Sequence, residues 1–157
     1  MLAQFQIYLT FENIYMWTNF GVLPFWLMLL LIPASKLTQI VVNSIILPLI
    51  FATIYLYIIY QAILLDDPFT DFFKVYFNLD NLYTLFATES FLLIFWLHFV
   101  AINLFLGSWM SRDAIKYNIS KRLVFIPLIL IYLTGPLGIV LYWFIRIFFS
   151  KKIGIHD

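Results

Sequence analysis

The sequence predicts an all-α, polytopic integral membrane protein with four transmembrane helices and a short interfacial helical segment between the second and third. Three observations predict this fold class. Of the 157 residues, 64% are hydrophobic and only 11% are charged, whereas a soluble domain carries roughly a quarter charged residues. A soluble domain of this length buries only about 70% of its unfolded surface, which would leave large apolar patches in water. Finally, four stretches are long enough to cross a bilayer.

Those four stretches carry no Asp, Glu, Lys or Arg in their bodies. A spanning helix needs about 20 apolar residues, because the hydrocarbon core is roughly 30 Å thick and each residue rises about 1.5 Å. The predicted spans are Asn13–Pro33, Ile40–Leu65, Ser90–Met110 and Leu123–Ile145. No internal repeat and no Gly/Ser-rich linker separates them, so we expect a single membrane domain over residues 1–157.

The connection 66–89 is acidic but rich in Phe and Tyr, which makes it too apolar for a solvated loop. One interpretation is one or two short helices lying at the membrane interface. The other is a folded lid over the helix bundle.

Composition excludes several classes of function. The net charge of +1 comes from dispersed basic residues, so we expect no nucleic-acid partner. The absence of cysteine removes disulfides, thiolate nucleophiles and Cys-ligated metal sites. The amino terminus has neither the basic start of a signal peptide nor the Arg/Ser richness of a transit peptide. We therefore expect a multi-pass protein of a bacterial inner membrane or a thylakoid-type membrane, with its first helix retained.

Four spans would divide the basic residues almost evenly between the two sides of the membrane, which leaves the orientation open. One side would hold Lys36, Arg112, Lys116, Lys121 and Arg122, and the other Lys74, Arg146, Lys151 and Lys152.

The third span combines a histidine with an asparagine and a glycine inside one apolar helix. Polar side chains are costly in hydrocarbon unless they point into the bundle and find a partner. At about 100° per residue, one stripe of this helix holds Trp96, Asn103 and Gly107, and another holds His98, Phe105 and Trp109. Trp96 and Trp109 also fit the aromatic belt of any membrane protein, and Asn103 fits an interhelical hydrogen bond.

His98 is the only histidine in a predicted span. It could transfer a proton near neutral pH, bind a metal, or simply donate a hydrogen bond to a neighbouring carbonyl. Only His156 could add a second imidazole, and no His/Asp/Glu pair has ligand spacing within a span. We therefore expect neither a metal site nor a cofactor.

Arg112 and Asp113 follow the third span, where the helix is expected to leave the membrane. They could pair with each other, or hold a polar group that enters from the interface. The alternative is an exposed pair of charges at the end of a helix.

The fourth span contains Gly135, Pro136 and Gly138, which predict a kinked helix with a notch of small residues. Pro136 has no N–H and frees the carbonyl of Tyr132. The glycines would admit a flat ligand or another helix, and Thr134 with Gly138 has the spacing of a helix-packing motif.

Three stretches resemble the membrane family typified by the plant neoxanthin-synthesis protein whose loss causes abscisic-acid deficiency. They are TNFGVLPFWLMLLLIPAS, LYTLFATESFLLIFWLHFVAINLFLGSWMSRDA and LVFIPLILIYLTGPLGIVLYWFIR, which together cover most of the chain. Where that family's third span usually has an aspartate after the histidine tract, this chain has Asn103, which cannot exchange a proton.

The resemblance implies a carotenoid-like or other lipophilic polyene as partner and an intramolecular isomerase that opens an epoxide. Under it, His98, Asp113 and Arg112 are the candidate catalytic group, with His98 transferring the proton and Arg112 and Asp113 gating the interfacial mouth. Asn103 would orient the oxygenated end ring. The candidate substrate-binding residues are Trp96, Asn103, Gly107, Trp109, Gly135, Pro136 and Gly138.

A non-catalytic protein remains the main alternative: a carotenoid-binding or membrane-complex assembly subunit that uses the same groove. A transporter or channel is disfavoured by the absence of repeats and of a charged pathway, although a homo-oligomer could form a pore between protomers.

Overall fold

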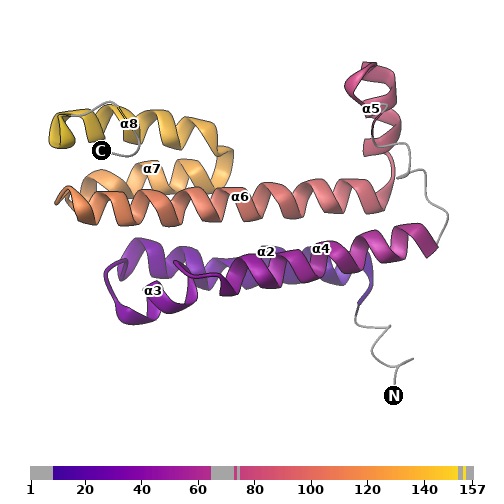
Figure 1. The fold of residues 1–157 in the computed structure, drawn as a ribbon, viewed down its shortest axis with the longest axis horizontal. Helices are drawn as coiled ribbons and strands as arrows, with labels where there is room; N and C mark the ends of the chain where they lie inside the picture. The colour runs from indigo at the N-terminus through magenta and orange to yellow at the C-terminus, as the bar shows by residue number, and fades with distance from the viewer. Residues whose placement is uncertain (1–8, 65–72, 74, 152–153, 155–157) are drawn as a thin grey trace. The chain divides into compact units, whose positions relative to one another are not determined.

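The computed structural model describes residues 9–64, 73, 75–151 and 154. Its helices, shown in Figure 1, are α2 (Phe11–Leu31), α3 (Lys36–Val41), α4 (Ile46–Leu64), α5 (Leu79–Phe86), α6 (Glu89–Lys116), α7 (Lys121–Thr134) and α8 (Pro136–Ser150). No strand occurs within this described part of the chain, which confirms the all-α prediction for it.

Three stretches are long and apolar enough to cross a membrane: α2, residues Lys36–Leu64 (α3 with α4), and α6. They correspond to the first three predicted spans. Leu31 ends α2 two residues before the predicted boundary, and α6 continues six residues beyond Met110. Arg112 and Asp113 are therefore helical rather than part of a connection.

The fourth predicted span does not form one kinked helix. Gly135 interrupts it with φ 68° and ψ −85°, a left-handed-side conformation that glycine adopts readily because it has no Cβ. Pro136 then begins α8, where its missing N–H would have had no helical partner in any case. At 14 and 15 residues, α7 and α8 are each roughly 21–23 Å long, short of the ~30 Å hydrocarbon core. The two helices pack side by side as a hairpin (Figure 1).

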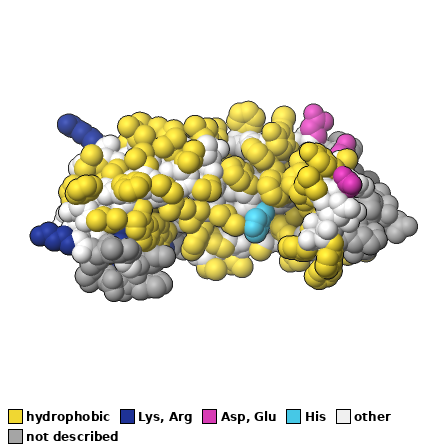
Figure 2. Space-filling model, turned by 90° about the horizontal axis from the view of Figure 1, so that it is seen from above, with side chains coloured by type: hydrophobic (Ala, Val, Ile, Leu, Met, Phe, Trp, Pro, Cys, Tyr) yellow, Lys and Arg dark blue, Asp and Glu magenta, His cyan; other side chains and the backbone are white. Residues whose placement is uncertain are grey.

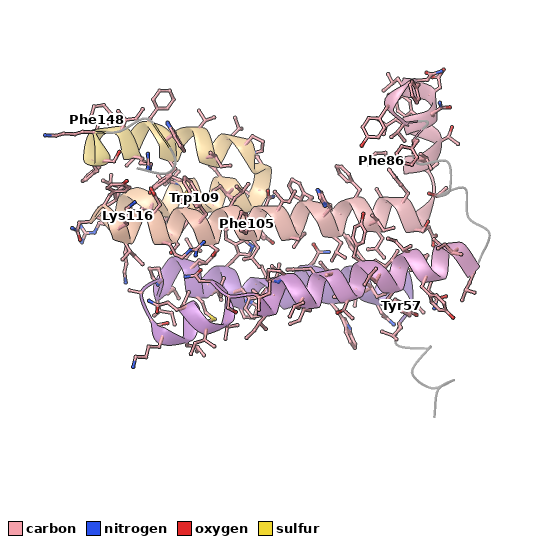
Figure 3. All side chains as sticks on the ribbon, viewed as in Figure 1. Tyr57, Phe86, Phe105, Trp109, Lys116 and Phe148 are labelled. Atoms are coloured by element: carbon pink, nitrogen blue, oxygen red, sulfur yellow. The ribbon has the colours of Figure 1, made fainter. Side chains whose placement is uncertain are left out.

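A short helix does lie between the second and third spans. Asn78 caps the start of α5, because its side chain accepts a hydrogen bond from the Asp80 N–H at 2.9 Å. Phe86 at the end of α5 packs edge-on against Phe91 and Phe95 of α6, with ring centroids 5.2 and 4.8 Å away (Figure 3). Residues 66–72 and 74 of the predicted connection lie outside the described residues, and both the interfacial and the lid interpretation stay predictions.

The chain forms two compact units, residues 1–21 with 48–100 and residues 22–47 with 101–157. The single membrane domain remains a prediction. In the first unit, the core is a cluster of apolar side chains from α2, α4 and α6. Its buried members are Ile14, Ile58, Leu93, Ile94 and Leu97.

The second unit is built around the closely packed α7–α8 hairpin and the carboxyl-terminal half of α6. A Cβ atom at Gly138 would lie 2.4 Å from the Ile131 N and 2.5 Å from the Pro127 carbonyl oxygen, so only glycine allows this approach. The Ser108 hydroxyl of α6 donates a hydrogen bond of 2.6 Å to the Oδ1 of Asn43, which lies in the turn after α3.

Large apolar side chains also face outward. Hydrophobic atoms cover most of the described surface in Figure 2, and the exposed fraction reaches 69% for Phe20 and 81% for Phe148. Such a surface is stable in lipid and unfavourable in water, in agreement with helices long enough to span a membrane.

Candidate functional site

A buried polar cluster lies in the second unit, where α6 and α8 meet. Asp113 of α6 accepts two hydrogen bonds on its Oδ2, from Arg146 Nε at 2.8 Å and from the Tyr142 hydroxyl at 2.7 Å. Arg146 and Tyr142 are fully buried, and Asp113 is 8% exposed. A buried charge is tolerated only when it is paired and hydrogen-bonded, so these three side chains depend on one another.

The guanidinium of Arg146 is surrounded on several sides. Its Nη1 donates to the Gly154 carbonyl at 2.9 Å, and its Nη2 to the Tyr117 hydroxyl at 3.4 Å. The rings of Tyr117 and Trp143 face its central carbon at 4.9 and 5.1 Å. Planar, weakly hydrated guanidinium groups suit such ring contacts, and the group links α8 to the carboxyl-terminal end of α6.

The cluster decides between the alternatives given for Asp113, whose ion pair is with Arg146 rather than with the neighbouring, exposed Arg112. It also revises the place of Arg146. Four spans would separate Arg146 from Arg112 and Asp113, but the turn at Gly135 brings α8 back along α7, and Arg146 lies beside Asp113. Arg146 was not among the predicted site residues, but it could have been found as the one charged residue within the apolar run IVLYWFIRIFF.

Trp109 lies beside this cluster. In Figure 3 its side chain extends from α6 towards α8, where it stacks on Trp143 and meets Tyr142 edge-on, both with centroids 6.0 Å apart. The predicted binding role of Trp109 stays a prediction, but its packing role is evident.

Asn103 and Gly135, both named as candidate substrate contacts, do lie together. Asn103 is 4% exposed, and its Oδ1 lies 2.7 Å from the place where a Cβ of Gly135 would be. Its Nδ2 has no hydrogen-bond partner among the described residues. One helical turn further along α6, Gly107 leaves room for the ring of Trp26, which would come within 2.8 Å of a Cβ there.

Pro136 and Gly138 differ in their surroundings. Pro136 is exposed in the first turn of α8, whereas Gly138 is buried against α7. The notch at Gly138 is therefore filled by the α7 backbone, which agrees with the helix-packing interpretation of this glycine.

Two candidate residues lie in the first unit. Trp96 donates from its indole Nε1 to the Asn19 Oδ1 at 3.1 Å and stacks on Phe99. His98 is exposed, as the cyan side chain in Figure 2 shows. His98 belongs to the first unit and Asp113, fifteen residues later on α6, to the second. A shared catalytic role of His98, Asp113 and Arg112 stays a prediction.

No group of three or more His, Cys, Asp or Glu side chains within the described residues is arranged to hold a metal ion. The candidate chemistry thus rests on His98, on the buried Asp113, Tyr142 and Arg146, and on the amide of Asn103.

These features define an all-α protein of membrane type, with three helices able to span a bilayer and a helical hairpin joined to the third by a buried ion pair. The model of the ABA DEFICIENT 4-like family matches residues 13–142, and the chain belongs to this family. This confirms the family resemblance. Neither the curated proteins nor the solved structures include a match to the chain.

Proposed function

We propose that this protein is a membrane-embedded isomerase that opens the epoxide of a carotenoid-like polyene. Membership of the ABA DEFICIENT 4-like family supports the substrate class, since the family is related to a plant protein involved in neoxanthin synthesis. The observation that carries the proposal is the exposed imidazole of His98 on an apolar helix long enough to span the membrane.

An exposed histidine suits a substrate that arrives from the lipid. His98 lies on α6 among outward-facing apolar side chains, including Phe95, Ile102 and Phe105, which are 43–61% exposed. A polyene dissolved in the bilayer reaches such a side chain without crossing the protein. An imidazole that faces hydrocarbon also carries a free-energy cost, which a polar group of a bound substrate would reduce.

The reaction needs one acid and one base, and a single imidazole can serve as both in turn. The protonated ring gives its proton to the epoxide oxygen as the adjacent C–O bond breaks. The neutral ring then removes a proton from the neighbouring chain carbon, and an allene forms. The imidazole returns to its initial state, and the product has the same composition as the substrate. Lipid surroundings keep water away from the cationic intermediate.

The other candidate residues have supporting roles in this proposal. Asn103 is buried against Gly135, so its role is to hold α6 at the turn between α7 and α8 rather than to contact a substrate that arrives from the lipid. Arg112 is exposed near the carboxyl-terminal end of α6, where it holds polar groups that approach from the membrane interface. Asp113 acts through Arg146 and Tyr142 as a positioning residue, since its Oδ2 is already hydrogen-bonded to both.

Replacing His98 with Ala is expected to reduce product formation by about 10²- to 10⁴-fold, the usual contribution of a positioned acid–base group. The protein is co-expressed in a bacterial host that accumulates an epoxy-carotenoid, and extracted pigments are separated by chromatography. The wild type should give a new isomer of unchanged mass. Because His98 is exposed, the variant should reach the membrane in normal amounts, which an epitope tag would measure.

Leu92→Ala provides the matched control, since Leu92 is another exposed side chain of α6 in the same unit. It should leave the isomer yield unchanged. Full turnover by His98→Ala would eliminate the proton-transfer role. Unaltered pigment that co-purifies with the wild type, without a new isomer, would contradict the enzyme and favour the carotenoid-binding alternative.

A further inference from the structure

A half-open cleft of about 330 Å³ lies in the second unit, and neither His98 nor the buried ion pair lines it. It is bounded by the carboxyl-terminal ends of α2 and α6 and by the first half of α7. Ten of its fourteen lining residues are apolar, among them Leu29, Ile115 and Leu128. The polar lining residues Asn118, Ser120 and Lys121 come from the connection between α6 and α7 and from the first residue of α7. The cleft is therefore amphipathic, with a polar mouth and an apolar interior.

The mouth carries positive charge. Lys121 lines it, Arg122 follows at the start of α7 without lining the cleft, and the first turn of α7 has no acidic residue. A helix amino terminus already carries a partial positive charge, so the side chains of Lys121 and Arg122 add unfavourable charge at this end of α7. Ser120 is the N-cap residue, but its side chain makes no capping hydrogen bond. The N–H groups of Leu123 and Val124 bond to the Ser120 carbonyl oxygen at 3.0 and 3.4 Å, but those of Lys121 and Arg122 lack the usual side-chain acceptor.

Lys121 is held at this mouth. Its Nζ donates to the carbonyl oxygen of Leu31 at the end of α2, 3.2 Å away. An ammonium group has three N–H donors, so this bond fixes its position and leaves donors for an anion.

A second and independent feature lies within the cleft. Ser111 lines it and is 3% exposed, yet its hydroxyl has no hydrogen-bond partner among the described residues. An unpaired buried hydroxyl costs free energy. Ser111 lies two helical turns before Asn118, on the α6 side of the cleft. Its hydroxyl is therefore placed to donate a hydrogen bond to a ligand oxygen that lies deeper in the cleft than the ligand group at the mouth.

We propose that this cleft binds one anionic glycerophospholipid. Its phosphate lies at the amino terminus of α7 beside Ser120 and Lys121, its ester oxygens approach Ser111, and an acyl chain follows the apolar lining. Helix amino termini with nearby cations bind phosphate readily, and the apolar interior distinguishes a lipid from a free anion. The inference is independent of the chemistry proposed for His98.

The test is native mass spectrometry of the full-length protein in a neutral detergent, titrated with dioleoyl phosphatidylglycerol or with dioleoyl phosphatidylcholine. We expect about tenfold tighter binding of the anionic lipid. Lys121→Gln should weaken that binding about fivefold, the value of one lysine near an anionic lipid. Lys151→Gln, which removes an exposed cation that does not line the cleft, should leave it unchanged.

Ser120→Asp gives a sharper variant. Aspartate is a good N-cap and a favourable charge at this position, so the variant should fold with an unchanged or higher Tm. Its carboxylate occupies the place of the phosphate, and the preference for phosphatidylglycerol should disappear.

Equal binding of the two lipids by the wild type would overturn the proposal, as would an undiminished preference in Ser120→Asp. Inorganic phosphate serves as a competitor without acyl chains. If it displaces the phosphatidylglycerol at equimolar concentration, the site recognises a free anion and the lipid assignment is wrong.

Discussion

Replacing Asp113 with Asn is expected to lower the free energy of unfolding by about 3–5 kcal/mol, the usual cost of breaking a buried ion pair by neutralising one member. Arg146 is fully buried and cannot be deprotonated within a protein. The asparagine side chain would keep a similar shape but would not neutralise the guanidinium beside it. Thermal unfolding of the purified protein in detergent, followed by tryptophan fluorescence, would measure the loss.

Arg112→Gln is the matched control for this prediction. Arg112 precedes Asp113 on α6 but is exposed, so its removal should change stability by less than about 0.5 kcal/mol. The triple variant Asp113→Leu, Tyr142→Phe and Arg146→Met should regain most of the lost stability, because it removes both buried charges and the buried hydroxyl that donates to Asp113. If Asp113→Asn unfolds at the wild-type temperature, the ion pair does not hold α8 to α6.

Replacing Gly138 with Ala is expected to cost about 3 kcal/mol, at the upper end of the usual cost of overpacking. The added Cβ would lie 2.4 Å from the Ile131 N and 2.5 Å from the Pro127 carbonyl oxygen. Both are backbone atoms of α7, so no side-chain rotation relieves the clash, and the hairpin must open. The same thermal unfolding experiment measures the loss.

Gly21→Ala reverses the sign of that effect and serves as its control. Gly21 lies within α2, and nothing is within 4 Å of a Cβ placed there. Alanine should therefore stabilise the helix by roughly 0.5–1 kcal/mol through its higher helix propensity. A similar gain for Gly138→Ala would show that helix propensity, rather than the contact of α7 with α8, decides the outcome at Gly138.

Several parts of the candidate site could be found from the sequence because they depend on residue type alone. His98 is a polar residue in an apolar helix, and such residues mark candidate functional positions whatever the packing is. Asn103 was selected as a polar residue within a span and Gly135 as a small residue beside Pro136, and the structure places them against each other. The partners of Asp113 were not found, since Tyr142 and Arg146 lie 29 and 33 residues away.

The order of residues alone was enough to predict an all-α protein, the first three of the four predicted spans, a short helix after the second, and a place in the ABA DEFICIENT 4-like family. Length and hydropathy are sufficient for the helices, because a bilayer sets how many apolar residues a span needs. That the last apolar stretch is a hairpin became evident only in three dimensions. Its length permits either one spanning helix or two short ones, and the difference depends on the turn at Gly135, the contact at Gly138 and the pairing of Arg146 with Asp113.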